Sequence, residues 1–390
     1  MTKDLAKTEA MPLRFGRHRE DQRRTYASRE EKAVQENAVN PALGILIFML
    51  GGLAGAVFYL PFKKVKNWAW ESYWLIYAVF GLLLVPWILA LATSPNVLPV
   101  LRSAPGNEMI YCLVCGAIWG LGGLTWGLMI RFLGVGLGLA MGAGLTSAAG
   151  TLIPPMLKGK EAITSMFTTS AGLVSVAAAL VSVAGIVLVG MAGMSKENEL
   201  PEEAKKKAVA EFNFKKGIMV AIFSGLMSSA MSFGLQGGSG IQKLALSIAP
   251  STSATWAGMP VLVVVLLGGF IVNAGWCIVL NIRNKTAGDY VAKGVPVVPN
   301  LVFAGAAGAI WCSQFICFKT GEPQMGPTSY IGWAVLMASM ILFSQVLGLM
   351  LGEWKGTSKK TVVLLAAGLV LLISSAVIAG YGGYLGQKAL

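Results

Sequence analysis

The side chains of this sequence that could bind a ligand are uncharged amides and aromatic rings inside long apolar runs. The candidate contacts are Trp119, Trp126, Gln314, Trp311, Gln236 and Tyr59. Amides pair with hydroxyl groups and aromatic rings cover an apolar C–H face, so the combination suits a sugar. Each residue alone is more often a packing residue of a helix bundle. It is the shared depth and symmetric placement of the set that favour a binding site.

The residues needed for metal or nucleophilic catalysis are missing from the apolar runs. The only histidine, His18, lies in the polar N-terminal segment, which excludes an HExxH zinc site and a Ser-His dyad. Asp289 is the only aspartate after residue 21, which excludes a paired-aspartate protease. Cys112 and Cys115 have CxxC spacing but no further ligands nearby, so we interpret them as small hydrophobic residues. We therefore predict no enzyme, no metal and no cofactor.

The composition indicates that these apolar runs lie in a lipid bilayer and not in water. Hydrophobic residues make up 55% of 390 positions, charged residues 13%, and the mean hydropathy is +0.67; a soluble chain has about 25% charged residues. A bilayer crossing takes roughly 20 apolar residues and is helical, because its backbone amides must be satisfied within the chain. Ten runs fit: 41–60, 72–93, 109–130, 133–157, 168–192, 217–237, 256–282, 300–318, 328–351 and 361–386. The prediction is an all-α integral membrane protein with ten transmembrane helices.

The segments between the runs divide the chain and orient it. Residues 1–40 form a polar tail of mixed charge that we predict to be disordered. Residues 41–192 and 217–390 each hold five runs and are joined by a charged linker at 193–216. Lysine and arginine are concentrated in the odd-numbered loops, which therefore face the cytoplasm. With ten crossings, the linker is cytoplasmic and both termini lie on the outer face.

Short repeats relate the two halves. GILIFMLGGL at 44–53 resembles GIMVAIFSGL at 217–226, and GAIW recurs at 116–119 and 308–311, in the third run of each half. Because each half has an odd number of runs, the second half enters the membrane upside down relative to the first. Inverted repeats are typical of alternating-access transporters, which bind their substrate at the midplane between the halves. We therefore predict two inverted five-helix repeats.

Longer segments identify a family. FYLPFKKVKNWAWE at 58–71, GAIWGLGGLTWGLMIRFLG at 116–134, EFNFKKG at 211–217, GAIWCSQF at 308–315 and EW at 353–354 resemble the L-rhamnose–proton symporter family, a sugar-uptake branch of the drug/metabolite transporter superfamily. The resemblance covers residues 44–386. It implies uptake of a deoxysugar with a proton across a bacterial inner membrane. Members often have asparagines where this chain has Gly123 and Thr125, which implies the loss of two polar sugar contacts.

A proton carrier has to be a buried carboxyl group, because burial raises a carboxylate's proton affinity toward neutral pH. Four glutamates lie near the ends of the runs: Glu71, Glu108, Glu322 and Glu353. Only Glu71 and Glu353 fall in segments that match the family. Lys63 and Lys64 closely precede Glu71, so we predict that Glu71 is the coupling or gating group, paired with a lysine while the inner mouth is shut. Glu353 is the second candidate, and a Glu–Lys pair that only anchors the turn is the alternative.

Other functions remain compatible with the sequence. A passive channel requires a polar-lined pore, whereas polar residues are few and scattered here. An exporter of small amphipathic metabolites would share the fold with a more apolar cavity, which Met141, Met227 and Met231 could line. A sugar transporter coupled to sodium would have the same outline. The expected partners are a small molecule, its coupling ion and the lipid bilayer, with no nucleic acid.

Overall fold

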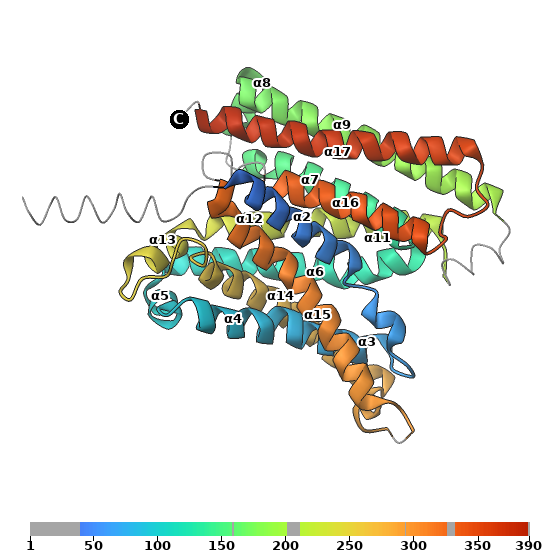
Figure 1. The fold of residues 1–390 in the computed structure, drawn as a ribbon, viewed down its shortest axis with the longest axis horizontal. Coiled ribbons are helices and arrows are strands. Elements are labelled where there is room, and N and C mark those ends of the chain that lie inside the picture. The colour runs from blue at the N-terminus through green and yellow to red at the C-terminus, as the bar shows by residue number, and fades with distance from the viewer. Residues whose placement is uncertain (1–39, 158–159, 201–210, 293, 326–331, 389–390) are drawn as a thin grey trace, which may run out of the picture. The chain divides into compact units, whose positions relative to one another are not determined.

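The computed structural model describes residues 40–157, 160–200, 211–292, 294–325 and 332–388 (Figure 1). The chain falls into two units, Met1–Asn40 and Pro41–Leu390. The predicted polar tail lies outside the described residues except for Asn40, and so do residues 201–210 of the predicted linker. All described helices belong to the second unit.

The regular structure of the described residues is entirely helical. The first half contains α2 (Pro41–Val57), η1 (Pro61–Lys64), α3 (Trp70–Ala78), η2 (Val79–Leu84), α4 (Val85–Thr93), α5 (Val97–Ser103), α6 (Gly106–Leu133), α7 (Val135–Leu157), α8 (Lys160–Thr168) and α9 (Ser170–Glu199). The second half contains α11 (Phe214–Ser228), α12 (Ala230–Gly237), α13 (Ser239–Ser247), α14 (Met259–Asn284), η3 (Ala287–Val291), α15 (Val297–Gly321), α16 (Gly332–Met350) and α17 (Lys359–Lys388).

Within the described ranges, eight helical segments are long and apolar enough to cross a membrane, judged by length and composition. They are Pro41–Lys64, Trp70–Thr93, Gly106–Leu133, Ser170–Lys196, Phe214–Ser247, Met259–Asn284, Val297–Met325 and Lys359–Gly386. Two shorter apolar stretches, Val135–Gly150 in α7 and Val335–Met350 in α16, occupy the places of the fourth and ninth predicted crossings. The prediction of an all-helical, multi-pass membrane protein is confirmed, whereas ten crossings stay a prediction.

Three predicted runs differ in detail from the helices that form. The second run consists of α3, the π-helical turn η2 and α4 in series, and the π turn lies where Gly81 meets the backbone of Gly308. The fifth run continues as α9 to Glu199, into the predicted linker, because a helix needs no apolar surroundings to continue. The sixth run is interrupted at Ser229, between α11 and α12.

The helices of the two halves contact one another in matching pairs. α6 packs on α11 and α14 of the second half, and α15 packs on α2 and α3 of the first half. α7 packs on α16, and α9 runs beside α17 along one edge of the bundle (Figure 1). The same set of contacts therefore recurs when the two halves are exchanged.

The repeated GAIW segments make equivalent contacts. Gly116 of α6 lies against the backbone of α14, and Gly308 of α15 lies against the backbone of α3. A Cβ atom at either glycine would collide with a main-chain carbonyl oxygen, so glycine is what allows these helices to approach closely. One turn later, Trp119 and Trp311 are buried in the centre of the bundle.

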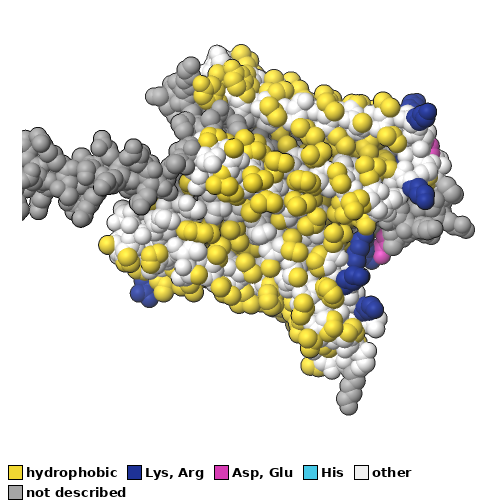
Figure 2. Space-filling view, in the orientation of Figure 1, with side chains coloured by type: hydrophobic (Ala, Val, Ile, Leu, Met, Phe, Trp, Pro, Cys, Tyr) yellow, Lys and Arg dark blue, Asp and Glu magenta, His cyan; other side chains and the backbone are white. Residues whose placement is uncertain are grey.

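The surface has the polarity of a membrane protein. Figure 2 shows apolar side chains over most of the visible face, with Lys and Arg gathered mainly at one end. This basic end comprises η1, the start of α3, the ends of α6, α9 and α14, the starts of α7 and α11, and the segment between α16 and α17. Its exposed lysines include Lys63, Lys64, Lys215, Lys355 and Lys359. The start of α6, the end of α15 and α13 form the opposite end.

Candidate functional site

A cavity lies where helices of both halves meet. Its lining consists of Gly55, Phe58, Trp74, Tyr77, Trp119, Gly123, Trp126, Thr146, Ser228, Met231, Trp311, Gln314, Phe315, Trp333, Met337 and Met340. A largely apolar and aromatic lining with few polar groups is the usual composition of a small-molecule site. The cavity is therefore the candidate binding site.

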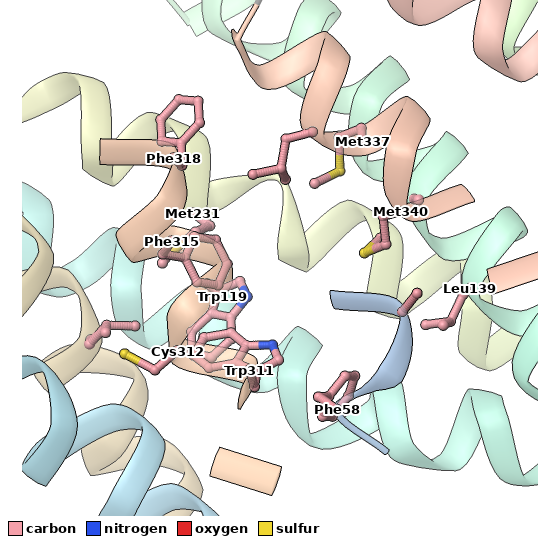
Figure 3. Close-up of a cluster of buried hydrophobic side chains, with 14 of the residues drawn as sticks. Phe58, Trp119, Leu139, Met231, Trp311, Cys312, Phe315, Phe318, Met337 and Met340 are labelled. Carbon is pink, nitrogen blue, oxygen red and sulfur yellow. The ribbon is translucent and has the colours of Figure 1, made fainter. Parts of the chain in front are cut away.

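One wall of the cavity is aromatic. Trp119 of α6 and Trp311 of α15 stack with their ring centroids 4.9 Å apart and an interplanar angle of 26°. The ring of Phe315 lies 4.7 Å from that of Trp311. Figure 3 shows Met337 and Met340 of α16 on the other side of the view from this stack. A flat apolar ligand face can therefore lie against the indole rings with thioether side chains opposite.

Several polar groups of the lining have no hydrogen-bond partner among the residues that the structure describes. The Ser228 hydroxyl and the Trp333 indole N–H are buried and unpaired. The amide of Gln314, a side chain only 5% exposed, likewise forms no hydrogen bond. Gly55 makes room for this amide, because a Cβ atom at that position would collide with the amide oxygen. Since a buried polar group without a partner is costly, these groups are available to ligand hydroxyls.

The structure brings together four of the six predicted contacts: Trp119, Trp126, Trp311 and Gln314. Gln236 is exposed on α12, because the helical period turns it about 140° away from Met231, which faces the cavity. Tyr59 also lies outside the lining, and its ring packs 5.2 Å from that of Phe62 in η1. Both residues were predicted from depth alone, and depth does not specify the direction of a side chain.

Several lining residues are not singled out by sequence patterns. Trp74 and Tyr77 stand at i, i+3 in α3 and therefore share one face of that helix, which is a usable signal. Ser228 and Trp333 carry no comparable signal, because a single serine or tryptophan in an apolar run more often packs against a neighbour. Only their missing hydrogen-bond partners distinguish them.

Two other buried amides hold helices together instead of facing the cavity. Asn273 of α14 accepts a hydrogen bond from Trp74 Nε1 at 2.9 Å and donates to two glycine carbonyl oxygens. Gln345 of α16 donates to the carbonyl oxygen of Gly136 in α7. Asn273 shows how a packing amide is satisfied in this bundle, whereas Oε1 of Gln345 is buried without a hydrogen-bond partner in the described part of the chain. Unlike Gln314, neither amide lines the cavity.

Glu71 lies in the first turn of α3 and is 6% exposed. Its Oε1 accepts hydrogen bonds from Asn284 Nδ2 and Thr286 Oγ1, both at 2.9 Å. The predicted pairing with Lys63 or Lys64 is not formed in this conformation: both lysines are exposed on η1, and the described residues contain no ion pair to Glu71. The left-handed cap at the end of α14 turns the chain back, so neutral donors reach the carboxylate instead.

Glu353 follows α16 and is 2% exposed. Its two carboxylate oxygens accept the N–H groups of Val135 at 2.7 Å and Gly136 at 2.9 Å, at the start of α7. The N-terminus of a helix favours a negative charge at this position. Burial raises the pKa of the Glu353 carboxyl above its usual range, while the α7 amides, Lys196 and Lys63 act in the opposite direction.

Lys196, at the end of α9, is a second buried charge of the basic end. Its side chain is 0% exposed, and its Nζ has no hydrogen-bond partner in the described part of the chain. The ammonium group lies 4.9 Å from the ring centroid of Trp354 and 5.3 Å from that of Phe212, within cation–π range. The sequence places Lys196 in a charged linker and carries no sign of its burial.

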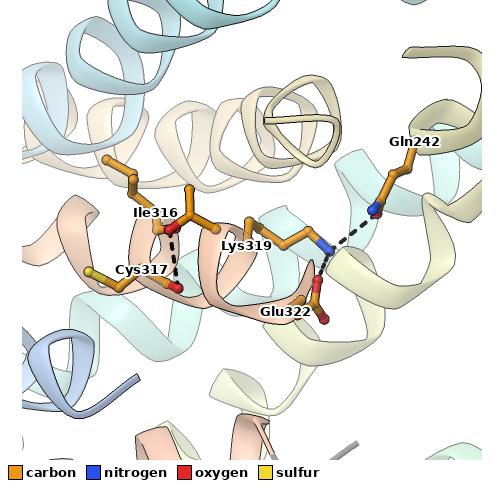
Figure 4. Close-up of polar contacts among 6 residues, drawn as sticks. Gln242, Ile316, Cys317, Lys319 and Glu322 are labelled. Atoms are coloured by element: carbon orange, nitrogen blue, oxygen red, sulfur yellow. Dashed lines mark hydrogen bonds and ion pairs between the residues drawn. The ribbon is translucent and has the colours of Figure 1, made fainter. Parts of the chain in front are cut away.

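The opposite end holds its buried cation differently. Lys319 of α15 has a side chain 4% exposed and donates to Glu322 Oε2 at 2.7 Å and to Gln242 Oε1 at 3.5 Å (Figure 4). Glu108 accepts two N–H groups at the start of α13, at 2.9 and 3.2 Å. Lys319 and Glu108 are therefore each bonded directly to protein groups.

The fold and the cavity define a multi-pass helical membrane protein with a candidate small-molecule site between its helices. The family model described as L-rhamnose-proton symport protein (RhaT) matches residues 36–384. The chain therefore belongs to the L-rhamnose–proton symporter family, as its sequence motifs predict.

Curated relatives agree with this membership. The L-rhamnose-proton symporter of Klebsiella pneumoniae is 30% identical over 344 residues, which cover 87% of this chain and 97% of the relative. The symporter of the same name from Cronobacter sakazakii matches with the same identity and coverage. That of Yersinia pestis is 29% identical over the same shares. These relatives are named as transporters, not enzymes.

Proposed function

We propose that this protein is a secondary active transporter that takes up a deoxysugar similar to L-rhamnose together with a proton, by alternating access. The observation that carries the proposal is the stacked Trp119–Trp311 pair in one cavity with the unpaired Gln314 amide. An indole platform suits the C–H face of a sugar, and a free amide suits its hydroxyl groups. Family membership supports the uptake direction and the proton.

The proposed architecture has ten crossings in two inverted repeats, residues 41–192 and 217–390, with a cytoplasmic linker at 193–216. The matching contacts between helices of the two halves support this arrangement. The short apolar stretches of α7 and α16 fit it too, because both helices line the cavity and are covered by protein as well as lipid. The basic end would face the cytoplasm of a bacterial inner membrane, with both termini outside.

The proposed substrate contacts are Trp119, Trp126, Trp311 and Gln314, while Gln236 and Tyr59 would have to act in another conformation. The proton would bind Glu71 or Glu353, the two buried carboxylates of the basic end. Lys63 and Lys64 are the exposed cations of the same end and remain candidates for pairing with Glu71 when the bundle rearranges.

Sugar counterflow in proteoliposomes tests the proposal. Gln314→Ala should weaken sugar binding by about 1–3 kcal/mol, or roughly 5- to 150-fold, because a buried hydroxyl loses its partner. Asn107→Ala is the control, since that amide is exposed at the start of α6 and lies outside the cavity. Unchanged affinity in a folded Gln314→Ala protein would remove Gln314 from the site, and the absence of counterflow for every sugar would remove the function.

A second candidate function is the export of small amphipathic metabolites. It is favoured by Met231, Met337 and Met340 in the lining, because flexible thioether side chains adapt to ligands of different shapes. The other two methionines expected for an exporter, Met141 and Met227, do not line the cavity. Counterflow from both membrane faces with sugars and with amphipathic compounds separates the two functions, and a sodium gradient in place of the proton gradient tests the coupling ion.

A further inference from the structure

A polar and an apolar group stand side by side in the cavity, and Gly55 of α2 shows that they are neighbours. A Cβ atom built at Gly55 would collide with the amide oxygen of Gln314 and would lie 2.8 Å from the sulfur of Met340. Both side chains therefore pack over the same glycine. One is an unpaired hydrogen-bonding group, and the other is a soft, polarizable side chain that bonds hydroxyl groups only weakly.

The apolar wall extends from Met340 along α16. Met337 lies three residues earlier and therefore on the same face of the helix. Both side chains are 3% exposed and line the cavity. Figure 3 shows both of them opposite the ring of Trp311. A ligand substituent that reaches this wall meets thioethers, with the Gln314 amide at its border.

We propose that Met340, supported by Met337, is the specificity residue that recognises the methyl group of a 6-deoxysugar. This inference rests on the proposed function. The C–H face of the sugar lies on the Trp119–Trp311 stack, and the hydroxyl on the ring carbon next to the methyl-bearing carbon pairs with Gln314. That pairing directs the methyl group to the Met340 sulfur, because neighbouring ring substituents reach neighbouring groups of the protein.

This arrangement disfavours two kinds of sugar: one that lacks the methyl group and one that carries a hydroxymethyl group in its place. A sugar without the methyl group leaves space beside Met340, and the loss of one methyl contact weakens binding roughly 10- to 200-fold. A sugar with a hydroxymethyl group buries an additional hydroxyl against a thioether, and an apolar pocket disfavours such an addition by roughly 100-fold. L-Lyxose and L-mannose make these two changes to L-rhamnose without altering the other ring hydroxyls.

Binding of the three sugars to the full-length protein in proteoliposomes provides the test. Met340→Gln offers the additional hydroxyl a partner, so the preference for L-rhamnose over L-mannose should fall about 10-fold or more. Met340→Leu keeps the wall apolar and should change this preference less than about 3-fold. Met350→Gln is the matched control, because it makes the same substitution on α16 at a side chain that is 80% exposed.

Two outcomes overturn the inference. One is an unchanged L-rhamnose to L-mannose preference in folded Met340→Gln. The other, which applies if that variant does not fold, is an unchanged preference for L-rhamnose over L-lyxose in Met340→Ala. A different result would contradict the proposed function itself: the unmodified protein would bind none of the three sugars. If Gln314→Ala weakens all three sugars while the Met340 variants keep both preferences, only the role of Met340 is lost.

Discussion

The two ends of the helix bundle each bury a lysine and treat it in opposite ways. At the end that lies opposite the basic end, Lys319 donates a hydrogen bond to Glu322 Oε2 at 2.7 Å. At the basic end, Lys196 Nζ has no hydrogen-bond partner within the described chain and lies over two aromatic rings. The cost of burying a charge is therefore offset by a direct bond at one end, and at the other only by ring faces and the field of Glu353.

The carboxylates show the same division. Glu353 and Glu108 each accept two N–H groups at the start of a helix, but Glu353 is 2% exposed whereas Glu108 is half-buried. The helix that Glu353 caps, α7, also carries Thr146 into the cavity, while α13 contributes nothing to the lining. A change of charge at Glu353 can therefore reach the cavity through the helix that Glu353 caps, whereas the helix that Glu108 caps provides no such connection.

Removal of the two carboxylates should have the largest and most unequal effect. Glu353→Ala leaves two buried N–H groups of α7 without an acceptor, so we expect the free energy of unfolding to fall by about 2–4 kcal/mol. Glu108→Ala leaves N–H groups that water can reach, and should cost about 1 kcal/mol, like the loss of an ordinary N-cap. Denaturant unfolding of both variants in one detergent measures the difference. Equal losses would contradict the contrast between the ends.

The same substitution at the two lysines should give a smaller contrast. Lys319→Met breaks a charged hydrogen bond and leaves Glu322 partly buried, which should cost about 2 kcal/mol. Lys196→Met removes a charge that has no hydrogen bond and keeps an apolar side chain over Trp354, so the change should stay below about 1 kcal/mol. Thermal unfolding of the two variants side by side checks this. A greater loss for Lys196→Met would reverse the comparison.

Titration of Glu353 should give the smallest effect, with a defined sign. Because burial raises the pKa of this carboxyl, the folded protein keeps a proton at pH values where the unfolded chain has released it. The resulting stabilisation is complete below the unfolded pKa and is lost as the pH rises through the folded pKa. Relative to Glu353→Gln, which cannot titrate there, the wild type should lose stability as the pH rises above the usual titration range of a glutamate carboxyl. Parallel stability curves for the two proteins would show that Glu353 stays ionised throughout.

Local patterns predicted the parts of this protein that depend on neighbours along the chain. Run length and hydropathy predicted the all-helical membrane class, because a bilayer leaves the backbone few alternatives. The repeated GAIW predicted that Trp119 and Trp311 lie at equivalent depths, and its glycines place both at the centre of the bundle. Depth alone did not predict the direction of the Gln236 side chain, which lies at the expected level but on the outer face of α12.

The amino-acid sequence was sufficient to predict the class, the apolar segments, the family and a short set of residues that could contact a sugar. Which groups lack hydrogen-bond partners depended on the packing of the helices. Gln314 and Asn273 are both buried amides, yet one is free in the cavity and the other is bonded to Trp74. Lys196 and Lys319 are both lysines at the ends of apolar helices, yet only Lys319 finds a carboxylate within hydrogen-bond reach. The reason is physical: a hydrogen bond requires two groups within about 3 Å of each other, and contacts between segments hundreds of residues apart depend on how whole helices pack.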